Sequence, residues 1–413
     1  MSQSQAADPW TMPIGQIDVA RPRLFQEGTW GPYFARLRRD DPVHYTPNEV
    51  FGPFWSITKY KDIMKVETNP AVFSSDSAYG GITLLDQPPE FRLPAFISMD
   101  PPKHDEQRKV VGPIVAPGNL ANMAGIIRER AARILDGLPR NETFDWVERV
   151  SVELTTQMLA TLFDYPFGDR SQLTHWSNVA VCNTHAPDAI VKSEEERFSE
   201  LRNMAVAMTK LWNKRVNAPP SFDLISMLAH GESTRNMQPK EFMGNLVLLI
   251  VGGNDTTRNS ISGGLHALMS HPAEYQKLRD NPGLIPSMVP EIIRWQTPLL
   301  YMRRTATRDI EFEGKQIKAG DKVAMWYASG NRDPEAIDRP EEFIIDRPRP
   351  RQHVSFGFGI HRCVGNRLAE MQLTILWEEI LKRFPVIEPM GEPERLLSSF
   401  VHGIVSLPVR IPG

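Results

Sequence analysis

Apolar residues recur every three or four positions over long stretches of the chain, which is the spacing of one face of an α-helix. The pattern predicts helices over residues 123–138, 146–163, 195–216, 240–268, 286–296 and 366–384. No internal repeat and no low-complexity linker divides the sequence. We therefore expect a mainly α fold with a small β portion, in one domain over residues 1–413 whose first residues, 1–8, form a flexible start.

Strand signals are short and clustered. Residues 43–45 and 53–60 are rich in β-branched and aromatic side chains, and residues 310–326 contain two short runs separated by Glu313-Gly314. This arrangement predicts a hairpin turn at Glu313-Gly314 and one further strand after it. The many prolines of residues 332–350 exclude a regular helix or a central strand, so we expect an ordered coil there.

Composition narrows the class of protein. The formal net charge of −3 gives no basic excess, so we expect no nucleic-acid partner. Only two cysteines occur, Cys182 and Cys363, without a CxxC or Cys/His cluster, which fits a reducing compartment and argues against structural zinc. The start lacks the features of a secretory signal, and the longest apolar run, residues 246–251, is far shorter than the ~20 residues that cross a bilayer. These features predict a soluble, cytoplasmic protein without stable membrane insertion.

Cys363 stands in the sequence FGFGIHRCVGN, directly before the helix expected from residue 366. The positive end of a helix and its free backbone N–H groups favour the thiolate form of such a cysteine. Gly365 would let a flat ligand approach the backbone, and Phe356 could shield the sulfur. A lone cysteine is more often a small buried hydrophobe. A glycine-rich loop before a helix can also bind phosphate, but here no strand precedes it in a βαβ unit and no Lys-Ser/Thr pair follows.

The spacing Phe356-x-x-Gly359-x-x-x-Cys363-x-Gly365 resembles the haem-thiolate loop of the cytochrome P450 family at every defining position. The resemblance covers nearly the whole chain. It implies the single-domain cytochrome P450 fold, a haem b cofactor (iron protoporphyrin IX) and Cys363 as the ligand of its iron. Electron density from a thiolate ligand favours cleavage of the O–O bond.

The resemblance also implies a structural triad. Glu291 and Arg294 are three positions apart and so share a helix face, and Arg347 of the proline-rich coil is the expected third member. An isolated pair of this kind is usually a surface ion pair worth well under ~1 kcal/mol. The triad is expected to hold the surroundings of the cysteine loop rigid.

A second motif, LVLLIVGGNDTTRNSISGG, interrupts a strongly apolar helix with Gly252-Gly253 and Asp255-Thr256. Two adjacent glycines cost a helix roughly 1 kcal/mol each relative to alanine, so they need a compensating reason. One reason is close packing of another helix. The resemblance implies another, an oxygen-binding groove in which a local opening of the helix places Thr256 against dioxygen or a water, while Asp255 relays protons.

Haem carries two propionates, which need cationic or hydrogen-bonding partners. His104 and Arg108 are four positions apart on one helix face, and the resemblance implies that both contact propionates, as do Arg304 and His361. Arg303 adjoins Arg304, so spacing alone leaves open which of the two points inward. Surface charges are the plainer interpretation of each residue.

Basic residues also gather around the cysteine loop: the run RPRPR over residues 347–351, with Arg108, Lys109 and Arg362. A charge run is often only a solvated face, and the alternative is docking of an acidic electron-transfer partner. We expect no fused reductase, and the resemblance then implies electrons from NAD(P)H through a ferredoxin reductase and a ferredoxin. We expect a monomer.

The function implied is that of a bacterial-type monooxygenase, which inserts one atom of dioxygen into a C–H bond and reduces the other to water. Positions carried over from the family place four residues on the substrate wall: Leu248, Val251, Gly252 and Leu300, with Phe400 as a further candidate near the C-terminal turn. Their apolar character predicts an apolar substrate. The segments ITLLDQPPEFRLPAFISMDPPKHDEQRK and QTPLLYMRRTATRDIEFEG resemble the bacterial hydroxylases of alkane and fatty-acid chain ends.

Other functions stay open at this point. A terpene or steroid hydroxylase of the same family would share the motifs. A peroxygenase, which uses hydrogen peroxide directly, tends to lack the acid–alcohol pair, so Asp255-Thr256 argues against it. A non-enzymatic haem sensor would keep the cysteine loop, need no proton relay and usually carry an output domain, and no such domain is visible.

Overall fold

Helices make up most of the described chain in the computed structural model, which describes residues 8–184, 186 and 189–413. Residues 1–7 of the expected flexible start thus lie outside the described residues. The helices are α1 (Pro22–Gln26), α2 (Gly31–Asp40), α3 (Tyr60–Glu67), α4 (Lys103–Val111), α5 (Pro117–Asp136), α6 (Glu153–Phe163), α7 (Ser171–Val181), α8 (Glu194–Val216), α9 (Leu224–His230), α10 (Pro239–Ser270), α11 (Pro272–Asp280), α12 (Ile285–Gln296), α13 (Tyr327–Gly330) and α14 (Asn366–Arg383).

The strands form small sheets. The largest has the order β1-β2-β8-β5-β3, in which β2 and β8 are parallel and the other neighbours antiparallel. A second sheet joins β12 to β4 and β9, so the C-terminal strand pairs with a strand that precedes α6. The strands are β1 (Val43–Thr46), β2 (Phe54–Ile57), β3 (Phe73–Ser74), β4 (Thr143–Asp145), β5 (Met302–Ala306), β6 (Ile310–Phe312), β7 (Lys315–Ile317), β8 (Lys322–Met325), β9 (Glu388–Pro389), β10 (Glu394–Arg395), β11 (Ile404–Ser406) and β12 (Pro408–Arg410).

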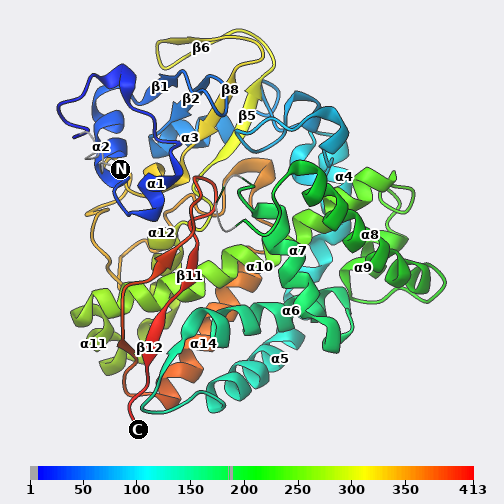
Figure 1. The fold of residues 1–413 in the computed structure, drawn as a ribbon, viewed down its shortest axis with the longest axis vertical. Helices are drawn as coiled ribbons and strands as arrows, with labels where there is room; N and C mark the ends of the chain where they lie inside the picture. Colours follow the sequence, from blue (N-terminus) through cyan, green and yellow to red (C-terminus); the bar gives the residue numbers. More distant parts are fainter. Residues whose placement is uncertain (1–7, 185, 187–188) are drawn as a thin grey trace.

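Figure 1 shows the larger sheet at one end of the molecule and helices α5 to α9 at the other, with α10 between them. The apolar stripes of the helices meet in one large cluster of buried side chains, which includes Trp146, Leu265 and Trp377. Two smaller clusters lie on opposite faces of the larger sheet, one around Trp326 and one around Val323. Helix α14, which follows the cysteine loop, packs on α5, α10 and α12, so the large core fixes its position.

The predicted elements are confirmed with small shifts at their ends. The helix expected over residues 195–216 is α8, which Ser193 caps by accepting a hydrogen bond from the Glu196 N–H. The hairpin turn lies at Glu313-Gly314, where both residues have positive φ angles of 48° and 74°. The proline-rich coil is ordered. The range 146–163 begins with a π-helical segment, η6 (Val147–Val152), before α6.

Helix α10 differs from the expected interruption, because it runs unbroken from Pro239 to Ser270. Glycine occupies positions 252 and 253 for different physical reasons. A Cβ at Gly253 would lie 2.8 Å from the Leu159 side chain, so close packing requires this glycine. A Cβ at Gly252 would meet nothing within 4 Å, because this residue faces a cavity. Close packing, the first reason weighed from the sequence, therefore operates at Gly253, whereas the expected local opening of the helix is absent and Gly252 leaves room on the cavity side.

Within the described residues, no single helix has the length and apolar character needed to cross a membrane. Two consecutive helical segments, Lys103–Val115 and Pro117–Asp136, are together long and apolar enough for a membrane span, but the angle between them is 49°.

Candidate active site

A cavity of about 390 Å³ lies where α10, α4, the cysteine loop and the segment after α12 meet. Its wall is mostly apolar and includes Leu248, Val251 and Gly252, as expected from the sequence. Cys363 and Thr256 face the same cavity, although they are far apart in the chain. The fold thus brings a thiol and a hydroxyl to one apolar chamber.

The cysteine loop is shaped by its glycines. Gly357 and Gly359 have φ angles of 67° and 65°, which residues with a side chain rarely adopt. A Cβ at Gly359 would also collide with the carbonyl oxygen of Glu67. The Cys363 N–H donates to the Phe356 carbonyl at 2.8 Å, which closes the loop. The loop therefore fixes the thiol at the N-terminal end of α14.

Cys363 is an exposed residue that faces the cavity. The protein atoms around its thiol partly desolvate it, and this raises the pKa of Cys363. The backbone N–H groups of Gly365 and Asn366 and the charges of Arg108 and Arg362 act in the opposite direction. These groups stabilise negative charge on sulfur, which is what a metal-bound thiolate requires.

Cationic and hydrogen-bonding groups gather on one part of the wall. Arg108, Arg304 and His361 line the cavity, and the His104 ring lies 4.2 Å from the His361 ring behind it. Of the two adjacent arginines, Arg304 is the one that points into the cavity. The neighbouring Arg303 turns away and donates to the carbonyl oxygens of Tyr79 and Thr83.

The sequence did not predict the partner of Arg304. Glu67, the last residue of α3, accepts from Arg304 Nη2 at 2.6 Å and also from the hydroxyl of Tyr327. Burial and the neighbouring Glu67 carboxylate raise the pKa of Tyr327 well above its usual value, so the hydroxyl stays protonated and donates. Glu67 precedes Arg304 by 237 positions, and no local signal connects them.

Two ring nitrogens in this cluster are buried without a hydrogen-bond partner, His361 Nδ1 and His104 Nε2. Ser75 Oγ lies 2.7 Å from His361 Nε2, and if it donates there, Nδ1–H is left as a free donor. Burial and the nearby Arg304 lower the pKa of His361 to about 2, so the ring is neutral. His104 has its pKa lowered by burial, while Asp105, 2.7 Å from Nδ1, favours protonation.

These residues fit a haem-thiolate group. The wall offers one thiol, a neighbouring set of cationic and unpartnered polar atoms that suits two carboxylates, and an apolar remainder that suits a porphyrin. The side chains that could hold it are Cys363 for the iron and His104, Arg108, Arg304 and His361 for the propionates. Arg108 already donates to the carbonyl of Arg362, beside the cysteine.

Thr256 and Asp255 point to different surroundings. The Thr256 hydroxyl borders the cavity and donates to the Gly252 carbonyl at 3.0 Å, within the unbroken helix. Asp255 is fully buried and is not part of the cavity wall; it is paired with Arg258 and accepts from Ser177 Oγ at 2.5 Å. Both oxygens of Asp255 thus have partners, Arg258 on Oδ1 and Ser177 on Oδ2.

Leu300 does not line the cavity, which corrects the expectation from the sequence. The chain after α12 is extended here, so neighbouring side chains point in opposite directions. Leu299 faces the cavity, whereas Leu300 is buried in the cluster around Trp326. Phe400 lies on the cavity wall as expected.

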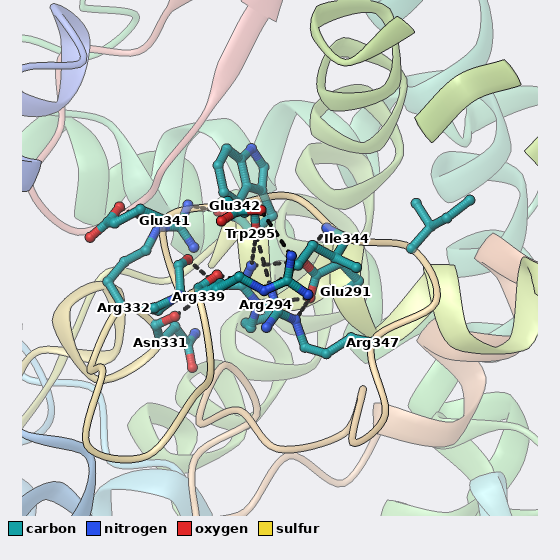
Figure 2. Close-up of polar contacts among 12 residues, drawn as sticks. Glu291, Arg294, Trp295, Asn331, Arg332, Arg339, Glu341, Glu342, Ile344 and Arg347 are labelled. Carbon is teal, nitrogen blue, oxygen red and sulfur yellow. Dashed lines mark hydrogen bonds and ion pairs between the residues drawn. The ribbon is translucent and has the colours of Figure 1, made fainter. Parts of the chain in front are cut away.

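The predicted triad forms and is wholly buried (Figure 2). Arg294 binds both oxygens of Glu291, at 2.8 and 2.7 Å, and Arg347 binds Glu291 Oε2 at 3.0 Å. Arg294 also donates to the carbonyl oxygens of Asn331, Pro340 and Glu342, which lie in the proline-rich coil. The triad therefore ties α12 to the coil that leads into the cysteine loop.

Two of the three arginines in the basic run at residues 347–351 have carboxylate partners. Arg347 belongs to the buried triad, and Arg351 is paired with Glu370 at 2.8 Å. In the part of the chain that the structure describes, Arg349 takes part in no ion pair and is exposed.

Comparisons with known proteins point to one family. A cytochrome P450 family model matches residues 283–411. Linalool 8-monooxygenase of Pseudomonas putida is 36% identical, with 95% of this chain and 98% of the relative covered. A methyl-branched lipid omega-hydroxylase of Mycobacterium tuberculosis is 34% identical, with 91% of this chain and 90% of the relative covered. The structure of cytochrome P450-153 from Novosphingobium aromaticivorans has a TM-score of 0.91 and 46% identity, covering 98% of this chain and 99% of that chain.

Proposed function

Because the chain belongs to the cytochrome P450 family, we propose that it hydroxylates the terminal carbon of linear apolar chains, medium-chain alkanes or fatty acids. Family membership confirms the fold and the monooxygenase class expected from the sequence, and it implies a haem-thiolate cofactor. The observation that carries the substrate proposal is the mostly apolar cavity of about 390 Å³ with Cys363 on its wall. The omega-hydroxylase among the relatives supports attack at a chain end.

The cofactor proposed is haem b. Cys363 would bind its iron, and Arg108, Arg304, His361 and His104 would bind its propionates. When bound, the haem supplies the activation of dioxygen that inserts one oxygen atom into a C–H bond and reduces the other to water. The protein contributes orientation, exclusion of water and control of protons.

Thr256 and Asp255 are proposed to deliver those protons. Thr256 is one of three hydroxyl-bearing residues of α10 on the cavity wall, with Thr257 and Ser260, and its hydroxyl bonds the Gly252 carbonyl, so it can donate a proton into the chamber. Asp255 lies behind it with Ser177 and Arg258. A proton entering from this side reaches Thr256 only when the Asp255 carboxylate is released from Arg258.

Selective attack at a chain end requires orientation. The terminal C–H bond is the strongest in an alkyl chain, so intrinsic reactivity favours internal carbons. A cavity that gains ~0.8 kcal/mol for each buried methylene holds the chain extended, and its walls decide which carbon lies near the thiolate side. Leu299 is the wall residue placed to restrict the chain there.

The test supplies the holoenzyme with ferredoxin, ferredoxin reductase and alkanes and fatty acids of graded length, and identifies the alcohols by mass spectrometry. We expect terminal alcohols and an affinity that rises with chain length until the cavity is filled. Leu299→Ala should lower the ratio of terminal to internal alcohols roughly tenfold, because a removed side chain admits more than one chain position.

Leu300→Ala is the matched control. It should lower the free energy of unfolding by roughly 2–5 kcal/mol, as expected for a buried leucine, and leave the position of attack unchanged. If linear chains yield no alcohol while a terpene or a steroid does, the chain-end proposal is wrong. The linalool 8-monooxygenase among the relatives makes a terpene the first alternative to assay.

A further inference from the structure

A second pocket adjoins the cavity and shares six wall residues with it: Ile82, Thr83, Leu93, Ser98, Ala180 and Val247. We call it the mouth pocket; it has a volume of about 200 Å³ and lies between residues 77–98 and the first half of α8. Phe91 and Phe198 line it from its two sides, with ring centroids 5.6 Å apart. The two pockets are neighbours with a mainly apolar shared wall, which suits an alkyl chain that extends across both.

The positive and negative charges of the side chains in the mouth pocket do not balance. Arg197 is neutralised by Glu194, whose oxygens lie 2.5 and 2.7 Å from its Nη1. Arg92 is instead held by backbone carbonyls, with Nε donating to Gln87 at 2.9 Å and Nη1 to Ala78 at 3.3 Å. Among the described residues, no carboxylate lies within 4.0 Å of its guanidinium. The mouth pocket therefore contains one uncompensated positive charge in a fixed position.

Gln87 adds a second polar group. Its side chain lines the mouth pocket, and Oε1 is buried without a hydrogen-bond partner. Among the described residues, Gln87 Nε2 has no hydrogen-bond partner and is not buried, so its N–H groups can donate to an acceptor in the mouth pocket. The guanidinium and the amide together suit a carboxylate.

The cavity itself disfavours a charged end group, because a carboxylate in an apolar wall lacks compensation. The cations deeper inside have other partners: Arg304 is paired with Glu67, and Arg108 belongs to the set proposed to hold the haem propionates. An acid entering this protein is thus stabilised with its carboxylate at the mouth and its methyl end in the cavity.

We propose that the mouth pocket binds the carboxylate of a fatty acid through Arg92 and Gln87, so that the protein prefers fatty acids to alkanes and presents their methyl ends for attack. This proposal rests on the proposed function. Arg92 acts as a specificity-determining residue, because it reads the end of the chain that does not react.

The experiment titrates the holoenzyme with dodecanoate, methyl dodecanoate and dodecane, following the haem spin-state change and, independently, the heat of binding. For Arg92→Gln we expect the dissociation constant of dodecanoate to rise roughly tenfold to hundredfold, the range of a hydrogen bond to a charged group. The dissociation constants of the two uncharged probes should stay within about twofold. Arg92→Lys, which keeps the charge, should retain most of the preference for the acid.

Arg202→Gln is the matched control. It removes a positive charge from α8, a helix that borders the mouth pocket, at a residue that does not line the pocket. It should leave all three constants unchanged. If Arg92→Gln affects the acid and the ester equally, or affects neither, the proposed carboxylate site in the mouth pocket is wrong. Terminal alcohols from both probes would in that case still support the proposed function. If no linear probe binds the wild-type protein, both proposals are overturned.

Discussion

Thr256 shows how one side chain serves both the backbone and the cavity. Its hydroxyl donates to the Gly252 carbonyl at 3.0 Å, a bond that helix interiors tolerate, and the same oxygen borders the apolar chamber. Because a hydroxyl can donate one proton and accept others, Thr256 can pass a proton inward without carrying a charge.

Thr256→Ala should therefore uncouple the reaction. Without the hydroxyl, proton delivery is misdirected, and the reduced oxygen leaves with two protons as hydrogen peroxide instead of entering the product. Reductant consumption should continue while product formed per NAD(P)H falls roughly tenfold or more. Parallel assays of product, peroxide and NAD(P)H in the ferredoxin system measure this. Thr256→Ser, which keeps the hydroxyl, should restore most of the coupling, and unchanged coupling in Thr256→Ala would exclude the assigned role.

Among the elements, the proline-rich coil depends on its connection to α12. A coil without a hydrogen-bond ladder must have its carbonyl groups satisfied in another way. Arg294 and Arg347 provide the donors, and Glu291 compensates their charges. Burial alone would raise the pKa of Glu291, but the bonds from Arg294, Arg347 and the Ile344 N–H outweigh it and lower the pKa. The coil is ordered because this network is complete.

Glu291→Gln should lower the free energy of unfolding by about 3–5 kcal/mol near neutral pH, because it leaves buried guanidinium groups without a counter-charge. Chemical denaturation and haem retention measure the loss. Since the folded-state pKa of Glu291 is lowered, its contribution is complete above the ordinary carboxyl pKa of about 4.3 and is lost as pH falls toward the lowered value. The difference between wild type and variant should thus shrink on acidification. A difference that is constant with pH would contradict the ionised state of Glu291.

At the scale of the whole molecule, the net charge of −3 conceals an uneven distribution. Arg362 and Arg367 are exposed on either side of Cys363, and Arg108 links α4, and with it Lys109, to the Arg362 carbonyl. Within the described residues Lys109, Arg362 and Arg367 take part in no ion pair. We propose that an acidic ferredoxin docks at this positive face, beside the cysteine loop.

Arg367→Glu should raise the KM for an acidic ferredoxin roughly tenfold, because it reverses a charge on the docking face. The rate with wild-type protein should fall as salt rises, since the screening length shrinks from about 10 Å at 0.1 M to about 3 Å at 1 M. Steady-state kinetics at several salt concentrations measure both effects. Arg202→Glu on α8 is the control and should leave the KM unchanged. Equal effects of the two variants would exclude docking at this face.

Local spacing by itself determined much of this protein. The helices around Cys363 and Thr256, the turn at Glu313-Gly314 and the pair Glu291–Arg294 depend on residues at most a few positions apart. Periodicity and turn chemistry act over these distances, so a single sequence contains the information.

Only the tertiary structure decided which neighbour faces the cavity and which partner a charge finds. Leu299 and Leu300 are equally apolar, and the packing of the chain after α12 selects Leu299 for the wall. The pairing of Arg304 with Glu67 and the free charge of Arg92 depend on segments that approach only after folding. Such contacts arise when the large core fixes the elements relative to one another, and no pattern along the chain encodes them.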